Sequence, residues 1–535
     1  MKKKAFVKIL LGLLAAAMLL TACSGNPSPS SQSSSGAGGS SATGSDSAGE
    51  PTELVWYTSL SDVMAGKDGM VEAANQYIQQ KLGVTVDFHI YNSSEYTKTV
   101  STILSSGAYM DILFTGTNGG VDFNTNAVRN AFVPLEDYID QYLPGTKEQL
   151  PERAWDAFTL NGHIYAVPPM KDLAARWGFL ANQTMMDDLG VTFPEKFDTA
   201  YDLIPFLNEV KEARDAKYPD KAENPIISYA FNRLDRFYYF EGIVVGNDRA
   251  APLAIANVPG LSGFEGQGDG ESVFCPFYTQ EYRDYLKQVR ALVAEGIAPF
   301  DEDSFDPDKV LFNAGELLGS YPLGYVYVDE DMYAPYYKAR HYESENALMT
   351  TAIIQNGAQA ISSTSTNVER ALELLELVNN DSYLATTLRF GPEGSNWTDE
   401  DGDGLFEDGP QNADVSNRNW YNWYGWQFGS IIVSKYPQGY PANFAELVKQ
   451  LNDNSNQDSN LGFIFNPDPV TNEIAACNNV VEEYHGTLNK GQVDDIDAQV
   501  DAFVQKLKDN GCDKIVEEAQ SQLTAWRKSV GKTTK

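Results

Sequence analysis

Short strand-favouring runs alternate with helical patterns from residue 53 onward. Residues 54–57 favour a strand, and apolar residues then recur at helical spacing from Val71 to Leu82, where Gly83 ends the pattern. Residues 84–91 and 111–114 favour strands again, with a second helical pattern between them. This βαβαβ order predicts a parallel sheet with helices on its faces. In such sheets ligands bind beyond the carboxyl ends of the strands.

The same two patterns continue toward the carboxyl terminus. The sequence Thr366-Asn367-Val368-Glu369 matches a capping box and predicts that a helix starts there. After the amino-terminal segment, no run approaches the ~20 consecutive apolar residues of a membrane-spanning helix. Further elements are predicted as strands over 162–168 and 177–180 and as helices over 182–189, 201–217, 497–509 and 513–528.

The amino terminus has the pattern of an export signal. Residues 1–8 hold four lysines and no acid, and the apolar run 9–20 is too short to span a bilayer. The sequence Leu20-Thr21-Ala22-Cys23 resembles a bacterial lipobox, which implies removal of residues 1–22 and attachment of lipid to Cys23. The alternative is an ordinary signal peptide with a chance cysteine. Residues 23–52 are rich in Ser and Gly and predict a flexible tether.

Composition narrows the possible partners. The 535 residues hold 74 Asp+Glu against 39 Lys+Arg, a formal net charge of −35. This charge argues against nucleic acid as a partner and against electrostatic docking on an anionic membrane. Four cysteines are too few for a disulfide framework. Cys477 and Cys512 can pair, but we favour two buried thiols.

A series of short motifs, taken in order, resembles one protein family. These are Phe132–Glu136, Gly162–Pro168, Ala360–Ala371, Gly391–Gly394 and Gly462–Ala475 followed by Trp526. Together they resemble family 1 extracellular solute-binding proteins of ABC importers, and more narrowly the large lipoproteins of Gram-positive bacteria in that family. Val368 stands where the family usually has proline.

The resemblance implies an α/β fold of two lobes, joined by a hinge, that close over a ligand in an interlobe cleft. The expected N-terminal lobe is residues 53–166 and 311–360, and the expected C-terminal lobe is residues 167–310 and 361–535. It implies a monomer, anchored by lipid to the extracellular face of the cell membrane. The protein would capture a carbohydrate, most simply an oligosaccharide, and deliver it to an ABC permease.

Aromatic side chains are the candidate sugar ligands, because flat rings cover the apolar face of a pyranose. Trp420, Trp423 and Trp426 fall at spacing three in one polar segment, and Trp397 and Trp177 are further candidates. The alternative is that these rings pack the lobe interior. Asp111 resembles an aspartate that the family often has near the cleft, although capping a strand explains it equally well.

Residues 399–410 resemble the opening of a calcium loop. Asp399, Asp401 and Asp403 occupy positions 1, 3 and 5, Gly404 occupies position 6, and the carbonyl of Leu405 would be the ligand at position 7. Position 12 is Pro410 instead of glutamate, so Glu407 or Asp408 would have to complete the shell. The alternative is an acidic, solvated turn. Because the crowded carboxylates repel one another, we predict a structural calcium ion.

Two other functions stay open from the sequence. One is a membrane-anchored, secreted carbohydrate-active enzyme, a glycoside hydrolase or lyase, and the other is a folding or assembly lipoprotein. The sequence lacks the motifs H-E-x-x-H, G-x-S-x-G, C-x-x-C and a Walker loop. We therefore predict a binding protein and not an enzyme.

Overall fold

The computed structural model describes most of the chain after residue 51. It describes residues 52–60, 63–116, 119–194, 203–226, 243–245, 254–256, 270–298, 319–323, 339–414, 417–422, 426–441 and 443–532. All of them belong to one compact unit, Pro51–Lys535. The predicted signal peptide, Cys23 and nearly all of the predicted tether lie outside the described residues.

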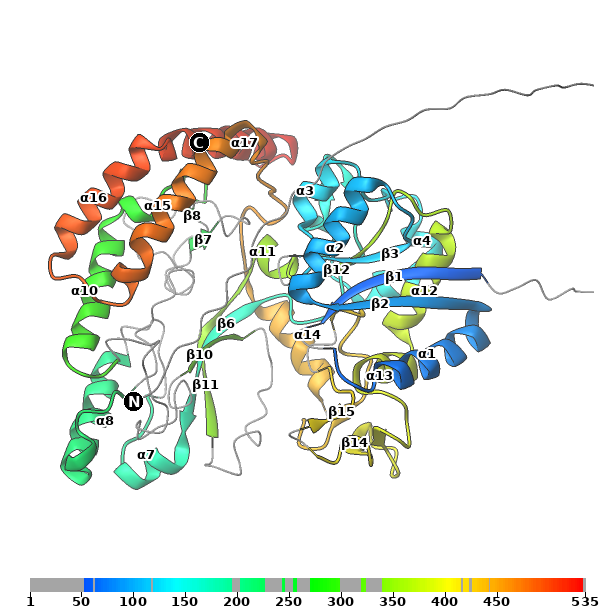
Figure 1. Cartoon of the computed structure of the whole chain (residues 1–535), viewed down its shortest axis with the longest axis horizontal. Helices are drawn as coiled ribbons and strands as arrows, with labels where there is room; N and C mark the ends of the chain where they lie inside the picture. The colour runs from blue at the N-terminus through cyan, green and yellow to red at the C-terminus, as the bar shows by residue number, and fades with distance from the viewer. Residues whose placement is uncertain are drawn as a thin grey trace, which may run out of the picture. The chain divides into compact units, whose positions relative to one another are not determined.

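The first sheet contains the predicted parallel strands. Strand β1 (Thr52–Leu60) pairs in parallel with β2 (Val84–Asn92) and with β3 (Ile112–Thr115). A late strand, β12 (Ala358–Ile361), adds antiparallel to β3, so that the order is β12-β3-β1-β2. Helices α1 (Lys67–Leu82) and α2 (Ser93–Ser106) connect the parallel strands, as Figure 1 shows. The predicted βαβαβ unit is confirmed.

Glycines end both of these helices, as the sequence predicted for Gly83. Gly83 has φ of 68° and Gly107 has φ of 67°, the left-handed conformation that glycine adopts without a Cβ clash. The start of α2 is capped by Asn92, whose side chain accepts a hydrogen bond from the N–H of Glu95 at 3.1 Å. Local sequence therefore sets where these elements begin and end.

The other elements have the following bounds. The helices are α3 (Phe123–Val128), α4 (Ile139–Tyr142), α5 (Pro144–Gln149), α6 (Glu152–Asp156), α7 (Gln183–Leu189), α8 (Ile204–Lys217), α10 (Gln280–Ala294), α11 (Thr351–Ile354), α12 (Val368–Asn380), α13 (Ser382–Phe390), α14 (Phe444–Asn454), α15 (Thr471–Asn489), α16 (Ile496–Asp509) and α17 (Cys512–Ser529), with 3₁₀ turns η2 (Pro219–Lys221), η3 (Pro276–Tyr278) and η7 (Asp468–Val470). The strands are β4 (Thr159–Leu160), β5 (His163–Ile164), β6 (Ala175–Asn182), β7 (Ile243–Val245), β8 (Ala254–Ala256), β9 (Val273–Phe274), β10 (Gly319–Leu323), β11 (Ala339–Met349), β13 (Trp397–Thr398), β14 (Leu405–Asp408), β15 (Tyr436–Pro437) and β16 (Asn456–Gln457).

A second sheet has the order β10-β6-β11-β16, in which β6 is antiparallel to both β10 and β11. Strands β7, β8 and β9 form a smaller antiparallel sheet. Val167 and Gln359 lie close to two of the predicted lobe boundaries, 166/167 and 360/361. They exchange backbone hydrogen bonds of 2.8 and 3.0 Å. None of the described helices combines the length and the apolar character needed to cross a bilayer.

The described residues form two large hydrophobic cores and a small third cluster around Trp397, and the two large cores correct the predicted lobe boundaries. The first core takes buried residues from 54–174 and 347–464, and the second takes them from 186–298 and 463–523. The predicted C-terminal lobe is therefore wrong for most of 361–464, because the apolar face of α12 packs against α1, α4 and α5. Strand β10, predicted within the N-terminal lobe, instead pairs with β6 in the second sheet.

The predicted capping box does not form, and the helix starts one residue later than predicted. Helix α12 starts at Val368 with Asn367 as its N-cap, and the Asn367 side chain makes no capping hydrogen bond. The N–H of Asn367 instead donates to the hydroxyl of Ser365 at 3.1 Å, which holds the chain in a tight turn before the helix. Thr366 therefore lies outside the helix and cannot cap it.

Candidate functional site

Hydroxyl groups gather at the carboxyl ends of the three parallel strands. The Ser59 hydroxyl, at the end of β1, donates to the hydroxyl of Ser93, directly after β2, at 3.1 Å. A Cβ added at Gly119, after β3, would lie 2.6 Å from the same Ser93 oxygen, and Gly119 has φ of +79°. The loops after β2 and β3 therefore approach each other at the edge where parallel sheets bind ligands.

Trp426 lies at this same edge. Its ring centroid is 5.8 Å from that of Phe114 in β3, and the two rings are tilted by 38°. A Cβ at Gly357 would lie 2.7 Å from the Phe114 ring and 2.9 Å from the Trp426 ring, so glycine allows the two rings and the chain to meet. The backbone carbonyl of Gln427, the next residue, accepts a hydrogen bond of 3.1 Å from the Thr58 hydroxyl in β1. Trp426 is 6% exposed.

Trp420 and Trp397 do not fit the predicted stacking role. Both are 0% exposed, so neither presents a face to a sugar in this structure. The Trp420 indole N–H donates to the carbonyl of Leu388 at 3.0 Å, and that of Trp397 donates to the carbonyl of Gly391 at 2.7 Å. Burial with a satisfied polar atom is how tryptophan packs an interior. We therefore correct the prediction for these two rings in favour of interior packing.

The ligand-binding roles of the other two candidate tryptophans, Trp423 and Trp177, remain predictions. Trp423 lies outside the described residues. Trp177 lies in β6, where its backbone is paired with Pro322 of β10. The structure describes the backbone of this residue but not its side chain.

Asp111 has a structural role and is not at the predicted ligand edge. It immediately precedes β3, at the amino end of the parallel strands, and is 0% exposed. One carboxylate oxygen accepts from the Val55 N–H at 2.9 Å. The other accepts from the hydroxyls of Tyr109 and Ser365 at 2.7 and 2.6 Å. These bonds join β1, β3 and the turn before α12, and they correct the ligand-binding expectation for Asp111.

The acidic loop converges as the calcium prediction requires. One carboxylate oxygen from each of Asp399, Asp401 and Asp403 lies within 4.8 Å of the other two. Asp399 also accepts from the N–H of Gly402 at 2.8 Å, and Asp403 accepts from the N–H of Leu405 at 2.8 Å. The turns fold the loop back on itself and bring the three carboxylates to one point.

The residues expected to complete a calcium shell are placed differently. Asp408 forms an ion pair with Arg418 at 2.7 Å and is not among the converging carboxylates, which corrects its assignment as a calcium ligand. Glu407 is exposed on β14, where it is paired with Thr398 of β13. The Lys435 ammonium pairs with Asp399 at 2.5 Å, and this hydrogen bond lowers the pKa of Asp399. Sequence analysis missed Lys435, which is distant in the chain and carries no local signal.

The loop chemistry fits a hard cation. Its converging donors are all oxygen atoms, which calcium and magnesium prefer to the nitrogen and sulfur donors that zinc accepts. Asp399, Asp401 and Asp403 would hold the ion from one side, and the remaining ligands would be water, the Leu405 carbonyl or Glu407. Lys435 neutralises one of the three charges, so repulsion in the loop is smaller than the sequence implied.

A buried charged pair that sequence analysis missed lies just before β6. Lys171 is 3% exposed and Asp172 is 8% exposed. The Lys171 ammonium donates to the backbone carbonyls of Asp172 and Ile353 at 2.9 and 3.1 Å. Burial lowers the pKa of Lys171, and burial raises the pKa of Asp172 to about 7. The run Met170–Leu173 has no periodicity that would have revealed this burial.

Comparison with known proteins shows what the chain resembles. It is 26% identical over 507 residues to a carbohydrate ABC transporter substrate-binding protein of Streptococcus pneumoniae, which spans 92% of this chain and 94% of that protein. The crystal structure of the N-glycan transport solute-binding protein NgtS from Streptococcus pneumoniae superposes with a TM-score of 0.73 at 23% identity, covering 89% of this chain and 99% of NgtS. The chain is a homologue of ABC-transporter solute-binding proteins.

This relationship confirms the family resemblance and the two-lobe α/β fold that the motifs predicted. Residues 459–528, which include α15, α16 and α17, match a domain of unknown function, DUF3502. The solute-binding protein FusA of Streptococcus pneumoniae, as an EF-hand mutant in complex with fructo-nystose, superposes with a TM-score of 0.51 at 16% identity and covers 89% of this chain and 100% of FusA. The name of that structure mentions an EF-hand, whereas the loop predicted here at 399–410 departs from a true EF-hand at position 12.

Proposed function

We propose that this homologue of solute-binding proteins is a cell-surface lipoprotein that captures an oligosaccharide between its lobes and hands it to an ABC permease. The observation that carries the proposal is the similarity, over 92% of the chain, to a relative named for carbohydrate transport. The fold supports it, because the first sheet presents hydroxyl groups and Trp426 at the carboxyl edge of its strands. The protein acts as a monomer without chemical turnover.

The ligand is a neutral oligosaccharide, and Trp426 contributes to its binding. We expect oligosaccharides such as Man5GlcNAc, fructo-nystose or kestose to raise the melting temperature without being cleaved. Trp426→Ala should weaken binding roughly tenfold, about 1.4 kcal/mol, because this ring is only 6% exposed and acts mainly by packing against Phe114 and so shaping the strand edge. Isothermal titration and chromatography of the recovered sugar provide the two measurements.

Trp526→Ala is the matched control, because this tryptophan packs against Phe463 of the second core. It should bind as the parent does. If Trp426→Ala folds and binds with parent affinity, stacking occurs elsewhere, and Trp423 and Trp177 become the rings to replace. Release of shortened sugar would instead support the carbohydrate-active enzyme.

Membrane attachment depends on Cys23. We expect Cys23→Ala to move the protein from the membrane fraction to the culture medium, because the lipid has no other attachment point. Ser24→Ala, the control, should stay with the membrane. Immunoblots of fractionated cells measure both, and retention of Cys23→Ala in membranes contradicts a lipid anchor at this residue.

The acidic loop binds calcium, and the ion stabilises the fold. Chelation should lower the melting temperature and added calcium should restore it, since an ion that binds only the folded state shifts the unfolding equilibrium. Asp403→Asn removes one converging carboxylate and should abolish most of this response. Glu400→Gln removes the same charge from an exposed neighbour outside the cluster and should retain it. A melting curve that chelator leaves unchanged means that the loop is an acidic turn only.

A further inference from the structure

Three cysteines that are far apart in the sequence meet in the second core. Cys275 precedes η3, Cys477 lies in α15, and Cys512 is the first residue of α17. All three are free and no more than 2% exposed. The proposed function uses none of them, and hydrophobic packing alone does not require three thiols at one place.

Helix α15 brings Cys477 to the corner between α16 and α17. Its sulfur lies 3.7 Å from the carbonyl oxygen of Leu507 and 3.6 Å from that of Asn510. The corner itself turns at Gly511, which has φ of +92°. A Cβ at Gly511 would lie 2.6 Å from Glu473, one turn before Cys477. The residue after this glycine is Cys512, so the corner places Cys512 beside the Cys477 face of α15.

Strand β9 brings Cys275 to helix α17, the helix that begins with Cys512. The Val273 N–H donates to the Gln520 side chain at 2.8 Å, and the Gln520 amide donates to the carbonyl of Glu271 at 2.8 Å. Cys512 and Gln520 are two four-residue steps apart and therefore lie on one face of α17. Cys275 follows β9 directly, so it lies near the first turn of α17, on the face that carries Cys512 and Gln520.

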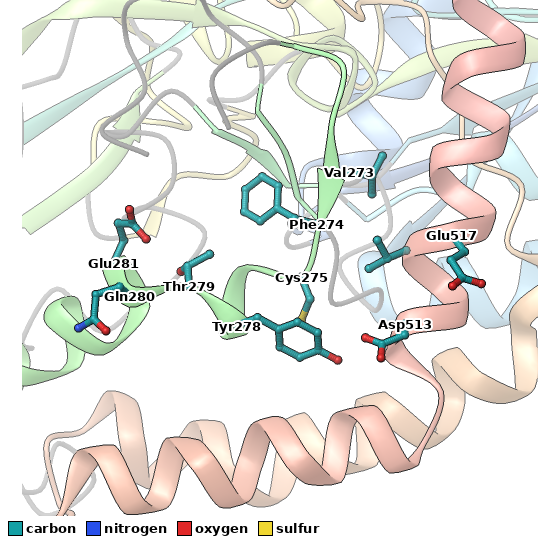
Figure 2. Close-up of a pocket in the computed structure, with 10 residues that line it drawn as sticks. Val273, Phe274, Cys275, Tyr278, Thr279, Gln280, Glu281, Asp513 and Glu517 are labelled. Atoms are coloured by element: carbon teal, nitrogen blue, oxygen red, sulfur yellow. The ribbon is translucent and has the colours of Figure 1, made fainter. Parts of the chain in front are cut away.

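Cys275 also lines a pocket of about 530 Å³ together with Tyr278, Asp513 and Val516. Figure 2 shows the Cys275 sulfur beside the ring of Tyr278, close to Asp513 at the start of α17. The pocket brings solvent to Cys275, which gives a small oxidant a route to one thiol of the cluster.

Cys512 is the central thiol. Cys275 and Cys477 both lie within interaction range of its sulfur, and their thiols lower the pKa of Cys512. The pKa of Cys275 is raised, first by burial and then by its bond with Cys512. The thiolate is the form that attacks in disulfide chemistry, so Cys512 is the most reactive of the three.

Oxidation accounts for this cluster better than metal binding does. Among the residues that the structure describes, the group of three donors close enough to share one ion is Asp399, Asp401 and Asp403, not the cysteines. A disulfide needs only two sulfurs to approach each other. Disulfides also persist outside the cell, where the proposed lipoprotein would work.

We propose that Cys275, Cys477 and Cys512 form an oxidisable thiol site in which one disulfide forms, always includes Cys512, and leaves the third cysteine reduced. With hydrogen peroxide as oxidant, the Cys512 thiolate attacks one peroxide oxygen, the O–O bond breaks, and the departing hydroxide takes up a proton as water. The thiol of Cys275 or Cys477 then attacks the sulfenic sulfur, the S–O bond breaks, and the departing hydroxide takes up the proton of the attacking thiol and leaves as a second water. Two thiols and one peroxide give one disulfide and two waters.

The test counts thiols and maps disulfides in the full-length chain carrying Cys23→Ala, so that only these three cysteines remain. After the folded protein is treated with dilute hydrogen peroxide and alkylated, we expect one free thiol where the reduced protein has three. Dithiothreitol should restore all three, and peptide mass spectrometry should find Cys512 in the linked pair. Three remaining thiols, a Cys275–Cys477 link or a link between two chains would each overturn the proposal.

Single variants add an independent test. Cys275→Ser and Cys477→Ser should each lose both remaining thiols on oxidation, because Cys512 still has one partner. Cys512→Ser should keep both of its thiols, and a disulfide in this variant would overturn the central role of Cys512. If a serine destabilises the core, peptide mapping of the three-cysteine protein still decides the question.

Discussion

Asp172→Asn will raise the free energy of unfolding at pH 8 and change it little at pH 4. Burial raises the pKa of this carboxyl to about 7 in the folded protein, against an ordinary value of 3.8. Between these two pH values the folded state keeps a proton that the unfolded state releases. The stability contributed by the protonated carboxyl is therefore complete below about pH 4 and is lost as the pH rises through 7.

The difference between the two pKa values corresponds to about 4 kcal/mol at most, because one pKa unit corresponds to 1.36 kcal/mol. Asparagine cannot ionise, so Asp172→Asn should not lose this stability as the pH rises. Urea unfolding at intervals from pH 4 to pH 8 measures the effect. Glu209→Gln, at an exposed carboxyl in α8, is the control and should follow the parent curve. Parallel stability curves for Asp172→Asn and the parent would falsify the assignment of a buried neutral carboxyl at this position.

Asp111→Ala will lower the free energy of unfolding by about 4 kcal/mol. The substitution leaves the N–H of Val55 and the hydroxyls of Tyr109 and Ser365 without their shared acceptor. A buried donor left unpaired costs about 1–3 kcal/mol, and hydrogen bonds to a charged acceptor lie at the upper end of that range. Asp111→Asn keeps one acceptor oxygen and should lose less. Denaturant unfolding measures both variants.

Asp122→Ala is the control for this prediction. Asp122 is an exposed N-cap of α3 that accepts one hydrogen bond, from Thr125 at 2.6 Å, so its loss should cost only about 1 kcal/mol. Ligand affinity should be the same in Asp111→Asn and the parent, because Asp111 lies at the amino end of the strands. Unchanged stability with lost sugar binding would restore the ligand role that the sequence suggested.

Helices and strands were predictable from the sequence where the spacing of apolar residues agrees with the residues that end an element. The helix over α1 has apolar residues at helical spacing and a glycine at its end, and both signals depend only on neighbouring residues. The strands β1, β2 and β3 were predicted for the same reason. The βαβαβ order then fixed their parallel pairing, since a helical connection between strands returns the chain in the same direction.

Tertiary burial was not predictable in this way. Trp397, Trp420 and Trp426 all belong to polar segments, yet the first two are completely enclosed and only the third reaches the strand ends. Trp420, for example, donates to the carbonyl of Leu388, which lies 32 residues away and leaves no trace in the local pattern. The predicted lobe boundary was wrong for a related reason. The apolar stripe of α12 shows that the helix is buried, but it does not show against which core the helix packs.

The interleaving of the two cores constrains how the chain can fold. The first core needs residues up to 464, while the second already uses residues from 186 and finishes near 523. The first core can be completed only when residue 464 has been synthesised and the second only near residue 523, so neither lobe can finish folding before these late residues emerge. Long-range contacts, such as β12 joining β3, form late and slowly. A chain that stays unfolded until it is nearly whole can be threaded through a narrow translocation channel before its tertiary structure forms.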